Sequence, residues 1–365
     1  MKKRFASIMA FALAAAMLTA CAAPAASAPA AEAAPAAEAA AEAPAVKQVN
    51  SVSVYTCYVE SEAMEIFDAF TEETGIEVNY VRLSTGEILT RLQAEKENPQ
   101  VSVFMGGAVD SHTKALNDGL LDPYVSKNIG VVDQSLVDPN GVFTPVSMIV
   151  TAFATNKDWL AKNGLEAPTS WQDLLKEEYK GNVCMAHPGT SGAAYTCFST
   201  ILQGMGVEEG FKYLKELDKN IVQYTKAGAA PYRMAGLGET GIGVGYDLDA
   251  NKTIEEGYPL VVTYPSDGAG CEVTCCSMVK GGPANEVEAA HAFIDWMLGD
   301  TSQKMATDNF YRFPTNPSIP LGEGRVPMSE INLIDYDSIW SAENKTEMVA
   351  RFEDEIRSSE NVKTD

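Results

Sequence analysis

A short run of small and hydroxylated residues is the strongest candidate for a binding site in this sequence. The run Gly189-Thr190-Ser191-Gly192-Ala193 follows an apolar segment and opens a stretch with helical spacing. A strand-to-helix turn of this composition exposes backbone N–H groups, adds two hydroxyls and presents the positive end of a helix dipole. The run therefore predicts an anion site. The alternative is a plain helix cap, in which Thr190 or Ser191 satisfies the helix and binds nothing.

Two loops nearer the N-terminus are expected to face the same site. Apolar patterns predict strands that end near Thr56 and near residue 104. Ligands bind beyond the carboxyl ends of parallel strands, which points to Thr56 and Cys57 in one loop and to Gly107 and Ala108 in the other. Gly107 would let backbone amides approach a ligand closely. Ordinary structural turns at both places remain the alternative.

The segments around these loops alternate between strand and helix patterns. Strands are predicted at 52–56, 76–80 and 101–104, with a helix between Ser61 and Gly75 and another near 87–97. A second series has strands at 183–186 and 242–246, with a helix that ends near Met205. This order is the signature of an α/β fold in which helices cover both faces of a mainly parallel sheet.

The length of the chain predicts two lobes. About 315 residues follow the N-terminal region, more than one hydrophobic core usually serves. The apolar run 143–155 is expected to cross from one lobe to the other, and the run 260–264 is expected to return. We assign residues 49–147 and 266–302 to lobe 1, and residues 148–265 and 303–365 to lobe 2.

The N-terminal region has the pattern of an export signal followed by a tether. Lys2, Lys3 and Arg4 precede an apolar run, which predicts a signal peptide over residues 1–20. Leu18-Thr19-Ala20-Cys21 looks like the lipobox of bacterial lipoproteins, in which the cysteine is lipidated. Residues 21–48 are rich in Ala, Pro and Glu and cannot form a core. We expect an extracytoplasmic, lipid-anchored protein; a cleaved signal with a chance cysteine is the alternative.

Composition argues against several classes of protein. The net charge of −23 disfavours nucleic acid as a partner. With three histidines in the chain, and with cysteine spacings that match no disulfide scaffold, we expect buried free thiols, no metal site and no cofactor. An extracytoplasmic hydrolase with Cys57 or Ser191 as the nucleophile is an alternative, but the sequence offers no clear general base. We expect a binding protein, and a monomer, rather than an enzyme.

Six segments form a recognisable pattern: Ser53-Val-Tyr-Thr56, Ile66 to Val78, Asn98 to Phe104, Thr190-Ser-Gly192, Gly243-Val-Gly245 and Gly281 to Asn285. Together they resemble the ferric-iron-type extracellular solute-binding proteins of bacterial ABC importers. The resemblance implies a two-lobed type II periplasmic-binding-protein fold, in which a hinge joins lobes that each have a central mixed sheet flanked by helices. It also implies a small-molecule ligand and a membrane permease as partners.

The same resemblance directs the choice of ligand. Members that bind iron use a histidine and a glutamate from lobe 1 and two adjacent tyrosines from lobe 2, whereas this chain has Tyr246-Asp247 in place of the tyrosine pair. Ferric iron or an iron chelate is therefore the alternative ligand. Members that bind sugar phosphates or phosphonates use carboxylates at matching positions, which implies contacts from Asp247 or Asp249 and from Glu272. Tyr246 is a candidate for stacking on the ligand.

Overall fold

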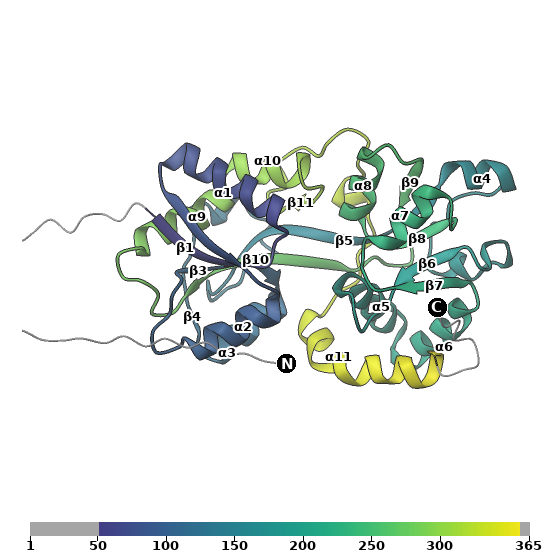
Figure 1. Cartoon of the computed structure of the whole chain (residues 1–365), viewed down its shortest axis with the longest axis horizontal. Coiled ribbons are helices and arrows are strands. Elements are labelled where there is room, and N and C mark those ends of the chain that lie inside the picture. The colour runs from purple at the N-terminus through teal and green to yellow at the C-terminus, as the bar shows by residue number, and fades with distance from the viewer. Residues whose placement is uncertain (1–50, 358–365) are drawn as a thin grey trace, which may run out of the picture. The chain divides into compact units, whose positions relative to one another are not determined.

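The computed structural model describes residues 51–357, and its strands form one continuous hydrogen-bonded sheet (Figure 1). The strand order is β2-β1-β3-β10-β5-β8-β6-β7, with β4, β9 and β11 paired at the sides. The predicted signal peptide, the tether and Cys21 lie outside the described residues. Among the described residues, no helix combines the length and the apolar character that a membrane span requires.

The first half of the sheet confirms the predicted alternation of strands and helices. Strand β1 is parallel to both β2 and β3, while β10 is antiparallel to β3. Gly75 ends the first helix in the left-handed region, with φ 70°, as predicted, but Val59 and not Ser61 is its N-cap. The elements are β1 Ser51–Thr56, α1 Glu60–Thr74, β2 Glu77–Arg82, α2 Thr85–Ala94, β3 Val103–Ala108, α3 Val109–Asn117, β4 Leu121–Asp122 and η1 Ile129–Val131.

The second half repeats this logic. Strands β7, β6 and β8 are parallel, and the bounds of β6 and β8 are those predicted from the sequence. The elements are β5 Thr144–Asn156, α4 Lys157–Asn163, η2 Gln172–Leu175, η3 Glu177–Tyr179, β6 Val183–Ala186, α5 Gly192–Met205, α6 Val207–Asp218, β7 Ile221–Thr225, α7 Ala230–Leu237, β8 Ile242–Tyr246, α8 Asp247–Glu255 and β9 Leu260–Thr263.

Helices cover both faces of each half, as the sequence pattern predicts. In β1, Val52 and Val54 pack against α1 and α9, whereas Tyr55 points to the other face, towards α2 and α3. This alternation with a period of two residues gives each half a core on each face. In β5, Phe153 belongs to the core with α5 and α6, and its neighbour Ala154 packs with α7 and α8.

Strands β5 and β10 connect the two halves. All of β5 is buried; its first part, up to Val150, pairs with β10, and its last part pairs with β8 and β9. The predicted crossing over 143–155 is therefore correct. The predicted return over 260–264 is wrong, because β9 pairs with the end of β5 and the chain returns through β10 (Cys271–Val279). An apolar run identifies a strand but not its partner.

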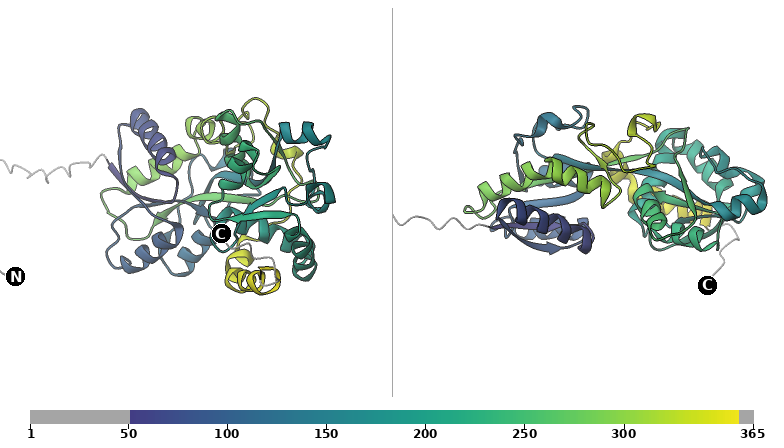
Figure 2. Two further views of the ribbon diagram at one scale, coloured as in Figure 1. Left: turned by 45° about the vertical axis from the view of Figure 1, so that its right-hand side comes forward. Right: turned by 90° about the horizontal axis from the view of Figure 1, so that it is seen from above.

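The C-terminal elements divide between the two halves (Figure 2). Helix α9 and the residues after α10 pack into the core of the first half through Phe293 and Phe310, whereas α11 packs into the second through Met348 and Phe352. The division of the chain into lobes at residues 147, 265 and 302 stays a prediction. The elements are α9 Val287–Met297, α10 Asp300–Asp308, β11 Phe313–Pro314, η4 Met328–Glu330, α11 Ser338–Phe352 and η5 Glu353–Arg357.

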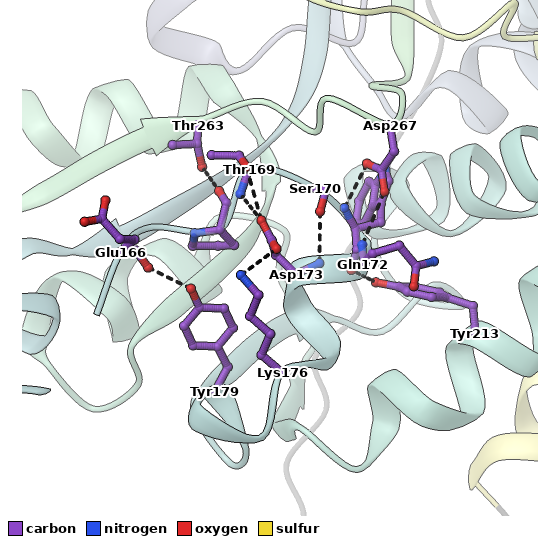
Figure 3. A network of polar contacts seen from close by, with 12 residues as sticks. Glu166, Thr169, Ser170, Gln172, Asp173, Lys176, Tyr179, Tyr213, Thr263 and Asp267 are labelled. Atoms are coloured by element: carbon purple, nitrogen blue, oxygen red, sulfur yellow. Dashed lines mark hydrogen bonds and ion pairs between the residues drawn. The ribbon is translucent and has the colours of Figure 1, made fainter. Parts of the chain in front are cut away.

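A polar network fixes the irregular segment before β6 to the segment that returns towards β10 (Figure 3). Asp267 accepts hydrogen bonds from the backbone N–H groups of Trp171 and Gln172. Asp173 accepts from Thr169 and forms an ion pair with Lys176. These contacts satisfy backbone groups that no strand pairs. They hold in place the segment from which the chain returns to β10.

The six cysteines of the described residues are free thiols. Four of them are buried, which confirms the expectation for those positions, and Cys57 and Cys271 are partly exposed. Burial raises the pKa of Cys184, Cys197 and Cys271 to about 12. These thiols are therefore protonated at neutral pH and unreactive.

Candidate functional site

Four helices begin at one cleft between the two halves, with a volume of about 280 Å³. Helices α2 and α3 come from the first half, and α5 and α11 from the second. Each presents its first turn, where backbone N–H groups lack helical partners and the dipole is positive. The lining residues are Thr85, Gly107, Ala108, Asp110, Ser111, Gly192, Tyr195, Thr196, Glu272, Tyr336, Ser338, Ser341, Ala342 and Lys345.

The rim of the first half depends on a glycine pair with positive φ at the end of β3. Gly106 and Gly107 have φ of 91° and 82°, and a Cβ at Gly106 would lie 2.8 Å from the sulfur of Cys57. Only glycine fits such a position without strain. The predicted close approach of a ligand to the backbone at Gly107 stays a prediction.

Buried His112 holds this loop in place. Its Nε2 donates to the carbonyl of Gly106 at 2.9 Å, and its Nδ1 accepts from the hydroxyl of Ser277 at 2.7 Å. The tautomer follows from the carbonyl, which can only accept. Burial lowers the pKa of His112 to about 4, so the ring is neutral at pH 7.

The rim of the second half is the start of α5. Ser191 is the N-cap, and its Oγ accepts from the N–H of Ala194 at 3.2 Å. Thr190 is exposed, and its hydroxyl donates to the carbonyls of His187 and Lys226. Both hydroxyls thus stabilise the turn itself, as expected for the alternative of a plain helix cap. Gly192 lines the cleft.

Glu272 is the predicted carboxylate that does reach the cleft. It lies near the start of β10, and the hydroxyl of Tyr246 donates to it at 2.5 Å. Thr196 donates to the same oxygen at 3.3 Å. Burial and the charge of Glu272 raise the pKa of Tyr246 well above its usual value, so Tyr246 remains a donor that orients Glu272.

The other charged groups of the cleft are Asp110 and Lys345, neither of which the sequence analysis identified. Asp110 lies in the first turn of α3; burial and nearby Glu272 raise its pKa to about 6. The Nζ of Lys345, on α11, lies 4.9 Å from the ring centre of Tyr195. Among the described residues that line the cleft, Lys345 is the one cation.

The position of Asp110 offered a signal that the sequence analysis did not use. It follows Gly107 by three residues, where the predicted strand gives way to the next helix. Lys345 gave no such signal, because α11 follows no strand and its place against α5 is a long-range contact.

Asp247 and Asp249 do not line the cleft. Asp247 is fully buried; its carboxylate lies 3.0 Å from Nη2 of Arg325 and accepts from the hydroxyl of Tyr264. Asp249 is partly buried in the first turn of α8. The ion pair of Asp247 leaves no local pattern, because its partner lies 78 residues away in sequence, and ligand contact by Asp247 and Asp249 stays a prediction.

The remaining predicted residues lie behind the lining. Thr56 is fully buried and its Oγ1 accepts from the N–H of Tyr58. Cys57 shares a hydrogen bond with Thr85, and burial raises the pKa of its thiol. Ala193 packs with Ile149. Ligand contact by these residues, and by Gly107, Ala108, Gly192 and Glu272 in the lining, stays a prediction.

The alternating strands and helices, the two strands that join the halves and the cleft between helix N-termini define a two-lobed periplasmic binding protein. The family model described as "Bacterial extracellular solute-binding protein" matches residues 98–339, and the chain belongs to this family. Its members are solute-binding proteins of ABC importers, which confirms the resemblance found in the sequence.

Individual relatives support the same assignment. The chain is 32% identical to an uncharacterized protein of Haemophilus influenzae over 79% of this chain and 86% of that protein. It is 26% identical to a putative 2-aminoethylphosphonate-binding periplasmic protein of Salmonella typhimurium, over 69% and 74% of the two chains. The periplasmic binding protein AfuA of Actinobacillus pleuropneumoniae, solved with fructose-6-phosphate, superposes with a TM-score of 0.72 at 30% identity, over 85% and 99%. Ferric-ion-binding proteins of 25% identity or less share the fold.

Replacement of Asp247 is expected to destabilise the fold. In Asp247→Asn the charge of Arg325 stays buried without its partner, so the free energy of unfolding should fall by about 3–5 kcal/mol. Chemical denaturation measures the change, with Asp249→Asn as the matched control on the same helix turn. Equal stability of both variants, together with lost ligand affinity in Asp247→Asn, would return Asp247 to the binding site.

His112 is expected to make the fold sensitive to acid. Its pKa is about 4 in the folded state and 6.5 when unfolded, so its contribution to stability is complete above pH 6.5 and is lost as the pH falls towards 4. Between pH 7 and 4.5, wild type should lose about 2–3 kcal/mol more than His112→Gln. Denaturation at both pH values measures this difference, and His291→Gln controls for removal of a partly exposed histidine. Parallel losses in wild type and His112→Gln would show that burial does not hold His112 neutral.

Proposed function

We propose that this binding protein captures a small organic anion with a phosphate or phosphonate group and delivers it to an ABC permease. The observation that carries the proposal is the convergence of four helix N-termini and Lys345 on one cleft. The positive dipole ends of helices attract phosphate oxygens, and a lysine adds a full charge. The names of the AfuA structure and of the Salmonella relative, a sugar-phosphate complex and a putative phosphonate-binding protein, point to the same class of ligand.

The proposed mechanism is closure of the two lobes around the ligand. Residues of α3 and of α11 line a common groove beside the cleft, so the two halves already approach each other there. A ligand that bonds to both rims binds the closed arrangement more tightly, and this difference in affinity shifts the balance towards closure. Strands β5 and β10 are the elements on which the lobes would swing.

The ferric alternative has less support from the residues. Hard ferric iron requires several anionic oxygens that converge on one point. The hydroxyl of Tyr246 is bonded to Glu272, and the carboxylate of neighbouring Asp247 is paired with Arg325. Within the described residues, no group of three or more His, Cys, Asp and Glu side chains has the arrangement of a metal site.

The hydrolase alternative lacks an activated nucleophile. Burial raises the pKa of Cys57, which keeps its thiol protonated. Ser191 caps α5, and nearby His187 uses Nδ1 to accept from the N–H of Gly189 and Nε2 to contact Glu353. A binding role without catalysis is therefore the proposal.

The proposal includes export and a lipid anchor at Cys21, with the chain acting as a monomer. Cys21→Ser should abolish incorporation of a labelled fatty acid during growth, because the lipobox cysteine is the acceptor. The matched control is Cys57→Ser, which leaves the lipobox intact. Equal labelling of wild type and Cys21→Ser would exclude the anchor without affecting the ligand proposal.

Ligand binding is tested by calorimetry and thermal unfolding with fructose-6-phosphate, 2-aminoethylphosphonate, fructose, ferric citrate and spermidine. We expect a phosphate or phosphonate to bind; at 100 times Kd it should stabilise the fold by about 2.7 kcal/mol and raise Tm by roughly 5 °C. Lys345→Met should weaken this binding by up to about fivefold, since the contact of an exposed lysine with an anion is worth about 0.2–1 kcal/mol. The exposed Lys219→Met should not. Binding of ferric citrate or spermidine alone would overturn the proposal.

A further inference from the structure

The cleft contains two carboxylates in addition to the groups that suit an anion. Asp110 comes from α3 in the first half, and Glu272 comes from β10, which joins the halves. With Lys345 as the only cation in the described lining, the charged side chains sum to one net negative charge when both carboxylates are ionised. These two carboxylates would repel a plain phosphate. They would instead attract a cationic group of the ligand.

The two carboxylates differ in the hydrogen bonds that they accept from the protein. Glu272 accepts from Tyr246 and Thr196. Asp110 accepts from its own backbone N–H and that of Ser111, and no side chain of the described residues donates a hydrogen bond to it. A carboxylate has about four acceptor positions, so Asp110 keeps acceptor capacity that faces the cleft.

Two charged side chains act on Asp110 in opposite directions. Burial and then Glu272 raise the pKa of Asp110 to about 6, and Lys345 lowers it without offsetting them. Tyr195 and Cys275, which also interact with Asp110, are neutral at pH 7.

The groove beside the cleft adds no net positive charge near Asp110. It contains Lys114, which is paired with Asp118, and Glu343.

We propose that Asp110 and Glu272 form a subsite for an ammonium group, so that the ligand is a zwitterionic aminoalkyl phosphonate or phosphate and not a neutral-tailed sugar phosphate. The inference rests on the proposed function, because the helix N-termini and Lys345 hold the anionic end. Charge-assisted hydrogen bonds to an ammonium are stronger than those to a hydroxyl. The subsite thus selects among ligands that share the same anionic head.

This arrangement also connects selectivity with closure. Asp110 lies on α3 in the first half and Lys345 on α11 in the second. A ligand with an ammonium at one end and a phosphonate at the other pairs with both, which a ligand with one charge does not. The zwitterion therefore has the larger differential affinity for the closed arrangement.

The test compares 2-aminoethylphosphonate with 2-hydroxyethylphosphonate, which differs only in the amine, and with fructose-6-phosphate, by calorimetry on the full chain. We expect the amine to bind at least about tenfold more tightly than the hydroxyl analogue. Asp110→Asn keeps the size and an acceptor but removes the charge, and should abolish most of this preference. Glu272→Gln serves as a second variant, and Asp133→Asn, far from the cleft lining, is the matched control.

The pH dependence gives a second readout. As the pH falls from 7 to 5, Asp110 becomes protonated, so the ratio of wild-type to Asp110→Asn affinity for 2-aminoethylphosphonate should fall towards one. The ratio cancels the ionisation of the phosphonate itself. A ratio that stays constant over this range would contradict the role of Asp110.

The possible outcomes separate the two proposals. If wild type binds 2-hydroxyethylphosphonate or fructose-6-phosphate as tightly as the amine, and Asp110→Asn does not alter the preference, the ammonium subsite is wrong while the anion-binding function stands. If none of the three binds to wild type, the proposed function itself is wrong. The comparison of ligands on wild type requires no variant, so it remains decisive even if a substitution impairs folding.

Discussion

The hydrogen-bonded pair of β5 and β10 is the constraint on which the rest of the structure depends. Because β5 pairs with β10 in its first part and with β8 and β9 in its last part, it fixes how the parallel strands of each half face each other. The carboxyl ends of β3 and β6 then lie at opposite rims of one cleft, and the helices that follow these strands begin there. The convergence of helix N-termini is thus a consequence of topology and not of any single motif.

Two buried ion pairs support this arrangement next to the crossing strands. Arg312 pairs with Glu62 on α1, and Arg325 pairs with Asp247 on α8. Arg325 also donates to the carbonyl of Arg312, so the pairs form one polar chain from the first half to the second. A buried pair adds little stability over an apolar substitute, but loss of one partner is costly. This chain of ion pairs therefore specifies geometry, and it pairs the carboxylate of Asp247 with Arg325.

The sequence predicted the elements better than the site. Strands β6 and β8 and the start of α5 follow from local periodicity and from glycine and serine at turns, which a single sequence records. The partner of Asp247, the pairing of β9 and the contribution of α11 are long-range contacts that leave no local pattern. The predicted site therefore includes loops that line the cleft, but it lacks Asp110 and Lys345, two of the three charged residues of the lining.

The net charge of −23 and an anionic ligand are compatible because the two act over different distances. Salt screens the many surface carboxylates beyond about 8–10 Å, whereas the helix N-termini and Lys345 act within contact distance in a partly buried cleft. Helix α11 matters most here. The hydroxyl of Tyr195 donates to the carbonyl of Ser341, which fixes α11 to α5. The charge of the cleft thus depends in part on a helix that a long-range contact holds in place.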